Sequence, residues 1–428
     1  MINNWDAADW QQQDKAHVWH PFTQVSYAPE NIIIESGEGA CFIDADGNRY
    51  IDGIASWWVN LHGHCNPYIA AAVTRQLQQL EHSIFAGFTH KPGIALAARL
   101  LGHLPQFAKV FFSDNGSTAV EVALKISFQY WHNQGTPKTK VIAFKDAYHG
   151  DTFGGMSVAA RNAFNAPFCP LLFDVIAIDL PTAENIEQVL SHLEGVLKNE
   201  DVASFIFEPL VLGAGGMLMY SAGHLQQLID LCKRYHCITI ADEVMTGFGR
   251  TGKFFAIDYL ERTPDIICMS KGITGGFFPL GATACKQFIF DAFISNDKMK
   301  TFFHGHSYTG NPVTCAAALA SLDLTESETT KAQIDRICSS HIEFAKELKQ
   351  YSSIEHVRHT GTVLAFDIKT DESTGYLNSS AEPLAQFFIK RNIILRPLGN
   401  VLYVLPPYCI TEEELEKVYE AIRELLDK

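Results

Sequence analysis

Two polar residues directly follow apolar stretches that have the character of buried strands, and together they suggest a specific chemistry. Lys271 comes after DIICMS and precedes a glycine-rich turn, and Asp242 closes the stretch CITIAD. A desolvated lysine loses its proton readily and can form a Schiff base with a carbonyl compound. A carboxylate nearby could pair with a protonated pyridine nitrogen. Taken singly, a solvated lysine and a helix-capping aspartate are the ordinary alternatives.

Four further residues fit the same chemistry, which is that of pyridoxal phosphate. Gly116 and Ser117 open a strongly periodic helix in SDNGSTAVEVALK, where free backbone N–H groups and the helix dipole favour a phosphate. Ser307 in HGHSYTGNP could add a hydroxyl to that phosphate, and Tyr148 in AYHGDTFGG could lie flat against the ring. The sequence thus offers an amine, a ring acid, a phosphate site and a flat group. A capped helix, a turn serine and a core tyrosine are the local alternatives.

Two other patterns bear on whether the chain binds a nucleotide or a metal ion. Gly247, Gly249 and Gly252 in GFGRTG have the G-x-G-x-x-G spacing of dinucleotide-binding turns. That pattern occurs mid-chain and leads into KFFAIDY instead of opening a helix, so we do not expect a nucleotide there. The scattered histidines and the ten cysteines show no spacing typical of a metal site, and we predict none.

Strand-like apolar runs alternate with helical periodicity from about Pro67 to Ala320, which predicts an α/β fold with a mostly parallel sheet. The predicted strands cover 141–144, 204–207, 238–241 and 266–269. The predicted helices follow Pro67, Pro92, Gly116 and Ser221. The candidate catalytic residues belong to this region, at strand ends, which is where open α/β sheets place their ligands.

The two ends of the chain differ from this central region and are predicted to share a smaller α+β domain. Residues 32–35 and 40–43 should form a hairpin, and strands are expected at 363–368 and 401–405. A capping box, T-x-x-E beginning at Thr411, precedes a charged terminal helix. The predicted division is 1–58 for the N-terminal part of the small domain, 59–320 for the large cofactor-binding domain and 321–428 for the C-terminal part of the small domain.

The amino-acid composition is typical of a globular enzyme and argues against a nucleic-acid-binding or membrane-spanning protein. The 428 residues are 47% hydrophobic and 19% charged, which is ordinary for a globular enzyme. A formal net charge of -15 without a basic cluster argues against nucleic acid, because a polyanion would be repelled. We expect no membrane span, since long apolar stretches are absent, and no export signal in the polar segment from Met1 to Lys15. Cysteines without a pairing pattern suit a reducing compartment, so we expect a cytoplasmic protein.

With these residues in place, the chain resembles the class III, fold-type I pyridoxal-phosphate aminotransferases. The resemblance covers nearly the whole chain and rests on the ordered motifs SDNGSTAVEVALK, AYHGDTFGG, FEPLVLGAGG, ADEVMTGFGRTGKFFA, SKGITGG and GHSYTGNP. It implies a large domain with a central sheet, and a smaller domain built from both termini. It also implies an obligate homodimer in which the Ser307 contact crosses to the partner subunit. The implied cofactor contacts are Gly116, Ser117, Tyr148, Asp242, Lys271 and Ser307, with Lys271, Asp242 and Tyr148 as the catalytic set.

Within that family, VWHPFT, ASWWVNLHGHCNP and RPLGNVLYVLPPY resemble the branch that serves biotin biosynthesis. This implies ping-pong transfer of an amino group to 8-amino-7-oxononanoate, giving 7,8-diaminononanoate. In that branch the pair Trp57 and Trp58 shapes the substrate pocket, and Arg396 binds the substrate carboxylate. An aromatic channel and a planar guanidinium suit a long aliphatic keto acid. The implied substrate contacts are Trp58, Tyr148, Lys271, Gly305, Arg396 and Tyr403.

The chain departs from that branch at two points. Phe22 stands where many members have a tyrosine whose hydroxyl contacts the substrate. The Trp57 and Trp58 pair resembles members that take the amino group from S-adenosylmethionine, whereas IIIESGEG, FFHGHSYTGN and RPLGN resemble members that use lysine. Both donors stay open on the sequence.

Two rival functions also fit parts of the sequence. Another class III activity, such as that of an ω-amino acid or ornithine aminotransferase, would share the cofactor residues, but WHPFT and SWW favour the biotin branch. A non-catalytic pyridoxal-phosphate-binding protein is the second rival. It is disfavoured because every expected catalytic position is filled.

Overall fold

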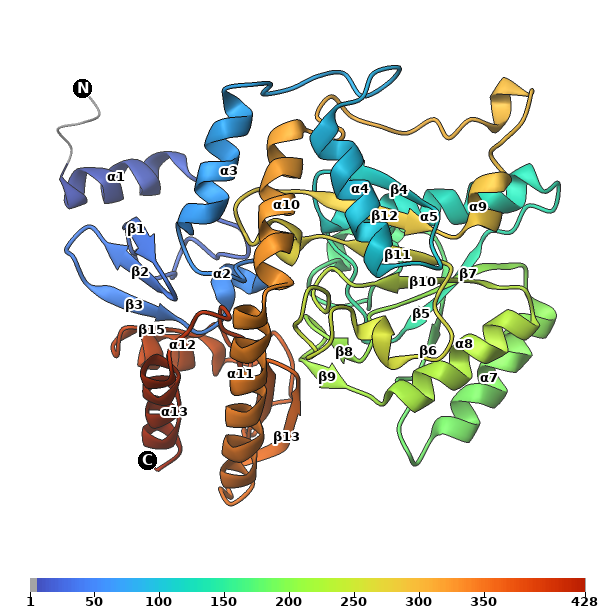
Figure 1. Cartoon of the computed structure of the whole chain (residues 1–428). Coiled ribbons are helices and arrows are strands. Elements are labelled where there is room, and N and C mark those ends of the chain that lie inside the picture. Colours follow the sequence, from blue (N-terminus) through green and yellow to red (C-terminus); the bar gives the residue numbers. More distant parts are fainter. Residues whose placement is uncertain (1–5, 428) are drawn as a thin grey trace.

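The computed structural model describes residues 6–427, and its centre is a seven-stranded sheet in the order β4-β12-β11-β10-β7-β5-β6 (Figure 1). All neighbouring strands are parallel except β12, which is antiparallel to both of its neighbours. The expected α/β fold with a mostly parallel sheet is confirmed. The strands are β4 (Lys109–Ser113), β5 (Lys140–Phe144), β6 (Val175–Ile178), β7 (Val202–Phe207), β10 (Ile238–Asp242), β11 (Ile266–Met269) and β12 (Gly281–Cys285).

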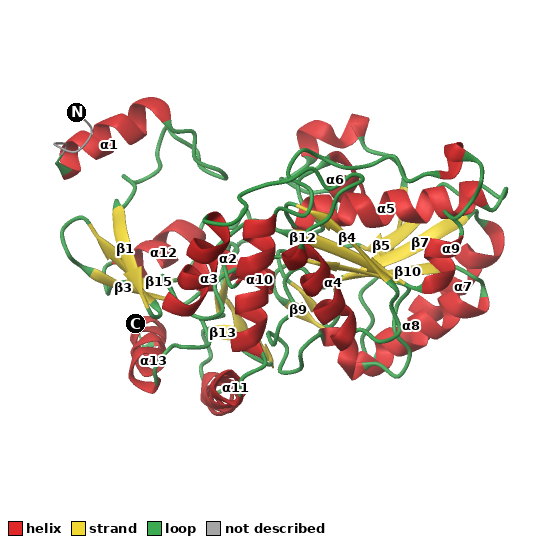
Figure 2. Ribbon diagram, turned by 45° about the horizontal axis from the view of Figure 1, so that its top comes forward, coloured by secondary structure: helices red, strands yellow, loops and turns green. Residues whose placement is uncertain are grey.

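The parallel strands are apolar along their length because helices cover both faces of the sheet. β7, with the sequence VASFIF, is buried at every residue. Helix α5 lies on one face, while α4 and α8 lie on the other (Figure 2). The helices of this region are α3 (Pro67–Leu77), α4 (Lys91–His103), α5 (Gly116–Asn133), α6 (Phe153–Ser157), α7 (Ile186–Asn199), α8 (Ala222–Arg234), α9 (Gln287–Asp291) and α10 (Pro312–Thr325).

Segments from both ends of the chain share one sheet, in the order β1-β2-β3-β15. The hairpin expected at 32–35 and 40–43 is present, although its first strand begins two residues later and carries a bulge between Ile34 and Ser36. Strand β15 pairs in parallel with β3, which joins the C-terminal segment to the N-terminal one. These strands are β1 (Ile34–Glu38), β2 (Cys41–Asp44), β3 (Arg49–Asp52) and β15 (Ile393–Ile394).

A second small sheet, in the order β13-β14-β16, packs with the C-terminal helices. The predicted capping box is confirmed, because Glu414 N–H donates to Thr411 Oγ1 at 3.1 Å and Thr411 N–H donates to Glu414 Oε2 at 2.8 Å. The predicted domain boundaries remain a prediction, and residues 1–5 and 428 of that division lie outside the described residues. The elements are β13 (Ile354–Thr360), β14 (Val363–Ile368), β16 (Val401–Val404), α11 (Glu328–Leu348), α12 (Ala381–Ile389) and α13 (Glu412–Leu426).

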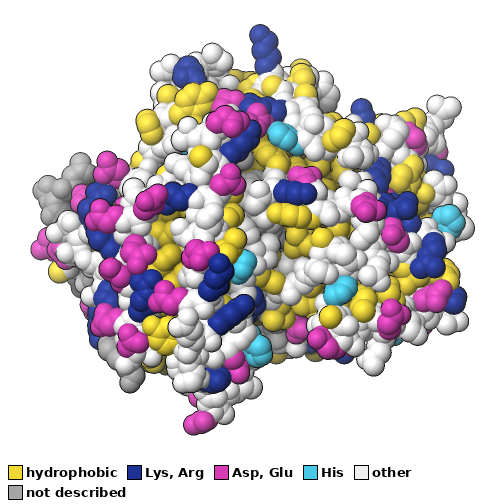
Figure 3. Space-filling model, turned by 60° about the horizontal axis from the view of Figure 1, so that its bottom comes forward, with side chains coloured by type: hydrophobic (Ala, Val, Ile, Leu, Met, Phe, Trp, Pro, Cys, Tyr) yellow, Lys and Arg dark blue, Asp and Glu magenta, His cyan; other side chains and the backbone are white. Residues whose placement is uncertain are grey.

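The N-terminal helix α1 (Ala7–His17) lies at the edge of the molecule and buries none of its residues, although Asp14 accepts a hydrogen bond from Asn31 (Figures 1 and 2). Trp19 and Tyr27, which follow it, are 90% and 80% exposed. Among residues 6–427 no helix is both long and apolar enough to cross a bilayer. On the face drawn in Figure 3, acidic, basic and hydrophobic side chains are interspersed. Short elements complete the fold: α2 (Ala55–Trp58), β8 (Val211–Leu212) and β9 (Leu218–Met219).

Candidate active site

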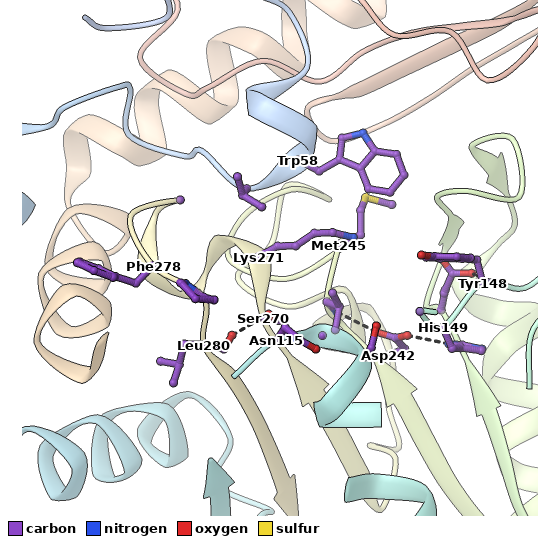
Figure 4. A pocket seen from close by; sticks show the side chains of 18 of the residues that line it. Trp58, Asn115, Tyr148, His149, Asp242, Met245, Ser270, Lys271, Phe278 and Leu280 are labelled. Carbon is purple, nitrogen blue, oxygen red and sulfur yellow. Dashed lines mark hydrogen bonds and ion pairs between the residues drawn. The ribbon is translucent and has the colours of Figure 1, made fainter. Parts of the chain in front are cut away.

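A cavity of about 430 Å³ lies at the carboxyl ends of β10 and β11. Parallel strands deliver their following loops to this edge of the sheet, and the N-terminus of α5 meets them there. Figure 4 shows Lys271 extending toward Trp58 and Met245, with Asp242 bonded to His149 beside it. The structure brings together six residues that were singled out from the sequence, and these are Trp58, Gly116, Ser117, Tyr148, Asp242 and Lys271.

Lys271 follows β11 and opens the short 3-10 helix η4 (Lys271–Thr274), with a positive φ of 43°. Removal from bulk water lowers the pKa of its ammonium group, while the nearby carboxylates of Asp242 and Glu208 act in the opposite direction. Its Nζ lies 4.6 Å from the centroid of the Trp58 ring. An amine with a lowered pKa is neutral, and therefore nucleophilic, at a lower pH than an ordinary lysine.

Asp242 is the last residue of β10 and is held in place from two sides. Val244 N–H donates to its Oδ1 at 3.1 Å, and His149 Nδ1 lies 2.7 Å from its Oδ2. His149 is fully buried and lines the same cavity, and its Nε2 has no hydrogen-bond partner among the described residues. The sequence interpretation did not include His149, because 93 positions separate it from Asp242. Only the fold brings the two residues together, so the motif AYHGD by itself gave no signal for this contact.

The N-terminus of α5 forms one wall of the cavity and presents backbone N–H groups to it. Asn115 caps the helix, its side chain accepting a hydrogen bond from Thr118 N–H at 2.9 Å, so that the N–H groups of Gly116 and Ser117 are left for another acceptor. A Cβ atom at position 116 would lie 2.6 Å from Val244 Cγ1, which explains why glycine occupies it. The arrangement can hold an anionic group such as a phosphate.

Tyr148 also lines the cavity, and a buried carboxyl fixes its backbone. Tyr148 N–H donates to Glu208 Oε1 at 3.0 Å, and Gly213 N–H donates to Glu208 Oε2 at 2.9 Å. Burial raises the pKa of Glu208 from 4.5 to about 7, with Asp242 adding to the increase and His149 opposing it. Burial also raises the pKa of the Tyr148 hydroxyl well above its usual value. Glu208 lay within FEPLVLGAGG but was given no role from the sequence.

The residues predicted to contact the substrate lie around this cavity, and only some of them line it. Trp58 lines it and donates through Nε1–H to the Tyr403 hydroxyl at 3.1 Å, which places the buried Tyr403 behind the indole. The Arg396 guanidinium carbon lies 4.5 Å from the centroid of the Trp57 ring. Gly305 and Ser307 are exposed and, within this one chain, do not line the cavity.

A chain of aromatic rings leads outward from Tyr148. Phe164 lies 6.1 Å from Tyr148 and 4.4 Å from Tyr376 between ring centroids, and Phe22 lies 5.8 Å from Phe164. Phe22 also meets Trp57 edge-on at 5.4 Å. The sequence did not reveal Phe164 or Tyr376, because both come from irregular segments without periodicity. Phe164 and Tyr376 line a second pocket, which the contact between Phe164 and Tyr148 joins to the cavity.

The glycine-rich stretch GFGRTG has a structural role. Arg250 within it is buried, and its guanidinium donates to Pro406 O at 2.7 Å and to Asn60 O at 3.1 Å. Gly249 and Gly252 adopt φ values of 101° and 94°, which suit glycine, and a 3-10 helix follows at Ala256–Tyr259 in place of the helix that a dinucleotide site requires. Among residues 6–427, no group of three or more His, Cys, Asp or Glu side chains is arranged to hold a metal ion.

A mostly parallel sheet whose strand ends present a lysine, an aspartate and a helix N-terminus to one cavity is typical of enzymes that bind a phosphorylated cofactor. The sequence pattern of the class-III aminotransferases matches residues 22–426. The chain therefore belongs to the class-III aminotransferase family, and the predicted family membership is confirmed.

Individual relatives make the relationship more specific. The adenosylmethionine-8-amino-7-oxononanoate aminotransferase of Synechococcus elongatus is 48% identical over 421 residues, which cover 96% of this chain and 99% of the relative. The crystal structure of the enzyme of that name from Methanocaldococcus jannaschii superposes with a TM-score of 0.92 at 36% identity, covering 98% and 99% of the two chains. A PLP-bound amine transaminase from an uncultivated Pseudomonas species superposes with a TM-score of 0.90 at 32% identity, covering 96% and 98%.

Proposed function

We propose that this aminotransferase transfers an amino group to 8-amino-7-oxononanoate in biotin biosynthesis, with S-adenosylmethionine or lysine as the donor. The single observation that carries the proposal is the cavity that joins Lys271, with its lowered pKa, to the buried carboxylate of Asp242 beneath Trp58. Relatives that match nearly the whole chain carry this activity in their names, which supports the choice of acceptor.

The cofactor is pyridoxal phosphate, in keeping with the family and with solved relatives in PLP-bound and PMP-bound forms. The residues of the cavity fit it. The free N–H groups of Gly116 and Ser117 would hold the phosphate, Asp242 would face the ring nitrogen and Tyr148 would cover the ring. When bound, the cofactor withdraws electrons from the substrate Cα and stores the amino group between the two half-reactions.

Lys271 has the properties of the residue that moves the proton. Its amine is shifted toward the neutral form by removal from water, so Nζ can take a proton from the substrate Cα and later return it. The Asp242 carboxylate would keep the bound cofactor ring electron-poor, and His149 Nδ1, 2.7 Å from its Oδ2, holds the carboxylate in position. Lys271 thus moves the proton at the substrate Cα, while Asp242 keeps the cofactor ring able to withdraw electrons from that carbon.

The substrate side combines aromatic walls with one cation. Trp58 covers Lys271, and the Trp57 ring lies against the Arg396 guanidinium. We assign Arg396 to the distal carboxylate of the keto acid, because a planar guanidinium binds a carboxylate through two parallel hydrogen bonds. The walls then exclude water along the aliphatic chain between the carboxylate and the ketone. Gly305 and Tyr403 are the further substrate contacts that we propose, and Tyr403 also accepts a hydrogen bond from Trp58.

We further propose that the enzyme is a homodimer whose partner completes each site. Ser307 and Gly305 lie on an exposed segment that does not reach the cavity of its own chain, as expected if they serve the neighbouring one. Trp19 and Tyr27, which are 90% and 80% exposed in the single chain, would be buried in such an interface. A cytoplasmic location is also proposed, and the ten free cysteines support it.

The deciding experiment adds S-adenosylmethionine and lysine separately to the purified, cofactor-loaded protein and follows loss of the cofactor absorbance. Addition of 8-amino-7-oxononanoate should then restore the absorbance after one of the two donors. That result would establish the acceptor and the donor together. Bleaching only by ornithine or by an ω-amino acid would keep the aminotransferase class and reject the biotin assignment. A spectrum that no amine changes would favour a non-catalytic protein.

The dimer can be tested by complementation between an inactive variant and an impaired one. Lys271→Ala lacks the amine, and Ser307→Ala is expected to weaken phosphate binding in the neighbouring site. If the site is shared, mixed dimers contain one site that has both wild-type residues, so refolding the variants together should restore part of the activity. Light scattering checks the mass of each species. A monomer with full activity would reject the shared site.

A further inference from the structure

The segment α2, Ala55–Trp58, is one turn of left-handed helix built without glycine. Its φ values are 51° at Ala55, 50° at Ser56, 70° at Trp57 and 74° at Trp58, and ψ is 47° at the two central residues. These are the dihedrals of a left-handed helix, in which each Cβ crowds a carbonyl oxygen. Four consecutive residues in this conformation persist only if the surrounding structure restrains them.

Asp52, the last residue of β3, supplies such a restraint from a fully buried position. Ile54 N–H donates to its Oδ1 at 3.2 Å, and the Ser56 hydroxyl donates to its Oδ2 at 2.9 Å. His64 Nε2 lies 3.0 Å from the same Oδ2. One carboxylate therefore holds the residue before the turn, a residue inside it and the chain that follows it.

The turn carries both tryptophans of the proposed substrate channel and directs them to different places. Trp58 is closely packed, since Lys271 Nζ lies 4.6 Å from its ring centroid and a Cβ at Gly213 would lie 3.1 Å from its Cζ3. Trp57 lies 4.5 Å from the Arg396 guanidinium carbon. A turn of the opposite hand would send both rings elsewhere. The conformation of the turn therefore fixes the position of Trp58 beside Lys271 and of Trp57 beside Arg396.

We propose that Asp52 is a positioning residue for the transamination. It does not line the cavity, and it acts by locking the left-handed turn that sets Trp58 against Lys271 and Trp57 against Arg396. A keto acid with a ketone near one end and a carboxylate at the other needs those two walls in fixed relation. This inference rests on the proposed function, because it names the part of the chain that fits the site to such an acceptor.

The test compares Asp52→Asn with Asp44→Asn in the cofactor-loaded enzyme. Asp44 is a matched control, because it is also buried, lies on the neighbouring strand β2 and holds a turn by accepting from the N–H groups of Asp46 and Asn48. We expect Asp52→Asn to raise KM for the keto acid at least about tenfold, since misplacement of a group by about 1 Å can cost a hundredfold. The factor by which KM rises should exceed the factor by which kcat falls. Asp44→Asn should leave both constants unchanged.

A spectroscopic readout tests the turn independently of activity. The near-ultraviolet circular dichroism of Trp58 is obtained as the difference between the unmodified enzyme and Trp58→Phe. This band should be lost in Asp52→Asn and kept in Asp44→Asn. Ser56→Ala removes only the hydroxyl contact, so it should weaken the band and raise KM by a smaller factor. It also keeps the test decisive if Asp52→Asn does not fold.

The proposal is overturned if KM and the Trp58 band are unchanged in Asp52→Asn and Ser56→Ala. It is equally overturned if Asp44→Asn has the same effect, or if kcat falls while KM stays constant. Failure of the proposed function would look different. In that case the unmodified enzyme would not turn over the keto acid, and the circular dichroism comparison would still show whether Asp52 holds the turn.

Discussion

The two walls of the cavity are built in opposite ways. Lys271 and Asp242 sit where regular strands end, on a sheet buried on both faces, and their places follow from the fold. The side that we propose for the substrate has Trp58 in the cavity lining and, around it, the rest of a left-handed turn, an exposed N-terminal phenylalanine and Arg396 from an irregular segment. Each residue of that turn carries a conformational cost of roughly 1–2 kcal/mol, which the surrounding contacts must offset.

This difference indicates a division of labour between chemistry and selection. Cofactor chemistry needs fixed groups at fixed distances, and strand ends provide them. Substrate selection depends on loop residues, which a family can change without rebuilding the sheet. Changes at the strand ends should therefore act on the rate of the chemical step, whereas changes in the irregular wall should act on substrate affinity.

Replacing Lys271 with alanine should have the largest effect. This variant lacks the amine that we propose as the base for the substrate Cα, so turnover should fall at least about 10⁴-fold. Steady-state kinetics and the cofactor absorbance measure the loss. Lys286→Ala is the matched control, because this lysine is also partly buried with a lowered pKa but pairs with Asp265 outside the cavity. Comparable losses in both variants would contradict the assignment of Lys271.

Asp242→Asn should slow the chemical step while leaving substrate affinity nearly unchanged. A neutral amide no longer favours a protonated ring nitrogen, a change of about one to three pKa units, or roughly tenfold to a thousandfold in rate. Single-turnover bleaching by the donor measures this rate. Asp265→Asn serves as control, since Asp265 is a buried aspartate at the opposite end of β11 and should affect stability alone. An unchanged bleaching rate in Asp242→Asn would remove its catalytic role.

Glu208 should make stability depend on pH. Its pKa is raised from 4.5 to about 7, so its contribution to stability is complete below pH 4.5 and is lost as the pH rises through 7. The loss should approach roughly 3 kcal/mol at about 1.36 kcal/mol per pKa unit. Glu208→Gln should remove this part of the pH dependence of the free energy of unfolding, as measured by denaturant titration at several pH values.

Glu243→Gln provides the comparison for this pH dependence. Burial raises the pKa of Glu243 to about 7 as well, but it bonds to Thr246 and Ile257 behind the cavity. Its replacement should remove a similar, separate part of the pH dependence of the free energy of unfolding without changing kinetics. Glu208→Gln should also lower kcat/KM, because Glu208 holds the backbone of Tyr148. Equal kinetic effects in the two variants would mean that Glu208 has no special connection with the site.

On the irregular wall, Arg396→Ala should weaken binding of the keto acid by roughly 1.5–3 kcal/mol, the scale of a charge-assisted hydrogen bond. The single-turnover rate at saturating substrate should stay near that of the unmodified enzyme. Calorimetry or bleaching titrations give the affinity. Arg391→Ala is the control, since Arg391 pairs with Glu424 away from the cavity. If the affinity is unchanged in Arg396→Ala, another group binds the carboxylate.

The same division explains what could be predicted from the sequence. Lys271 and Asp242 were identified because a polar residue after a buried apolar run marks a strand end, and the start of α5 because of its periodicity. His149 was missed because only the fold brings it to Asp242. The turn at 55–58 was missed because ASWW contains no glycine to indicate positive φ values. Strand β12 was missed because GATAC is composed of small residues with weak strand preference.

The smallest predicted effect concerns Phe22, which lies 5.4 Å from Trp57 between ring centroids and is 44% exposed. Many relatives are expected to carry a tyrosine there, so Phe22→Tyr should add one hydrogen bond to the substrate. The gain should be about 1 kcal/mol, or roughly a fivefold lower KM, without a change in kcat. Phe164→Tyr, on the neighbouring ring, is the control. A change in kcat instead of KM would show that the irregular wall also governs the chemical step, and the division between the two walls would fail.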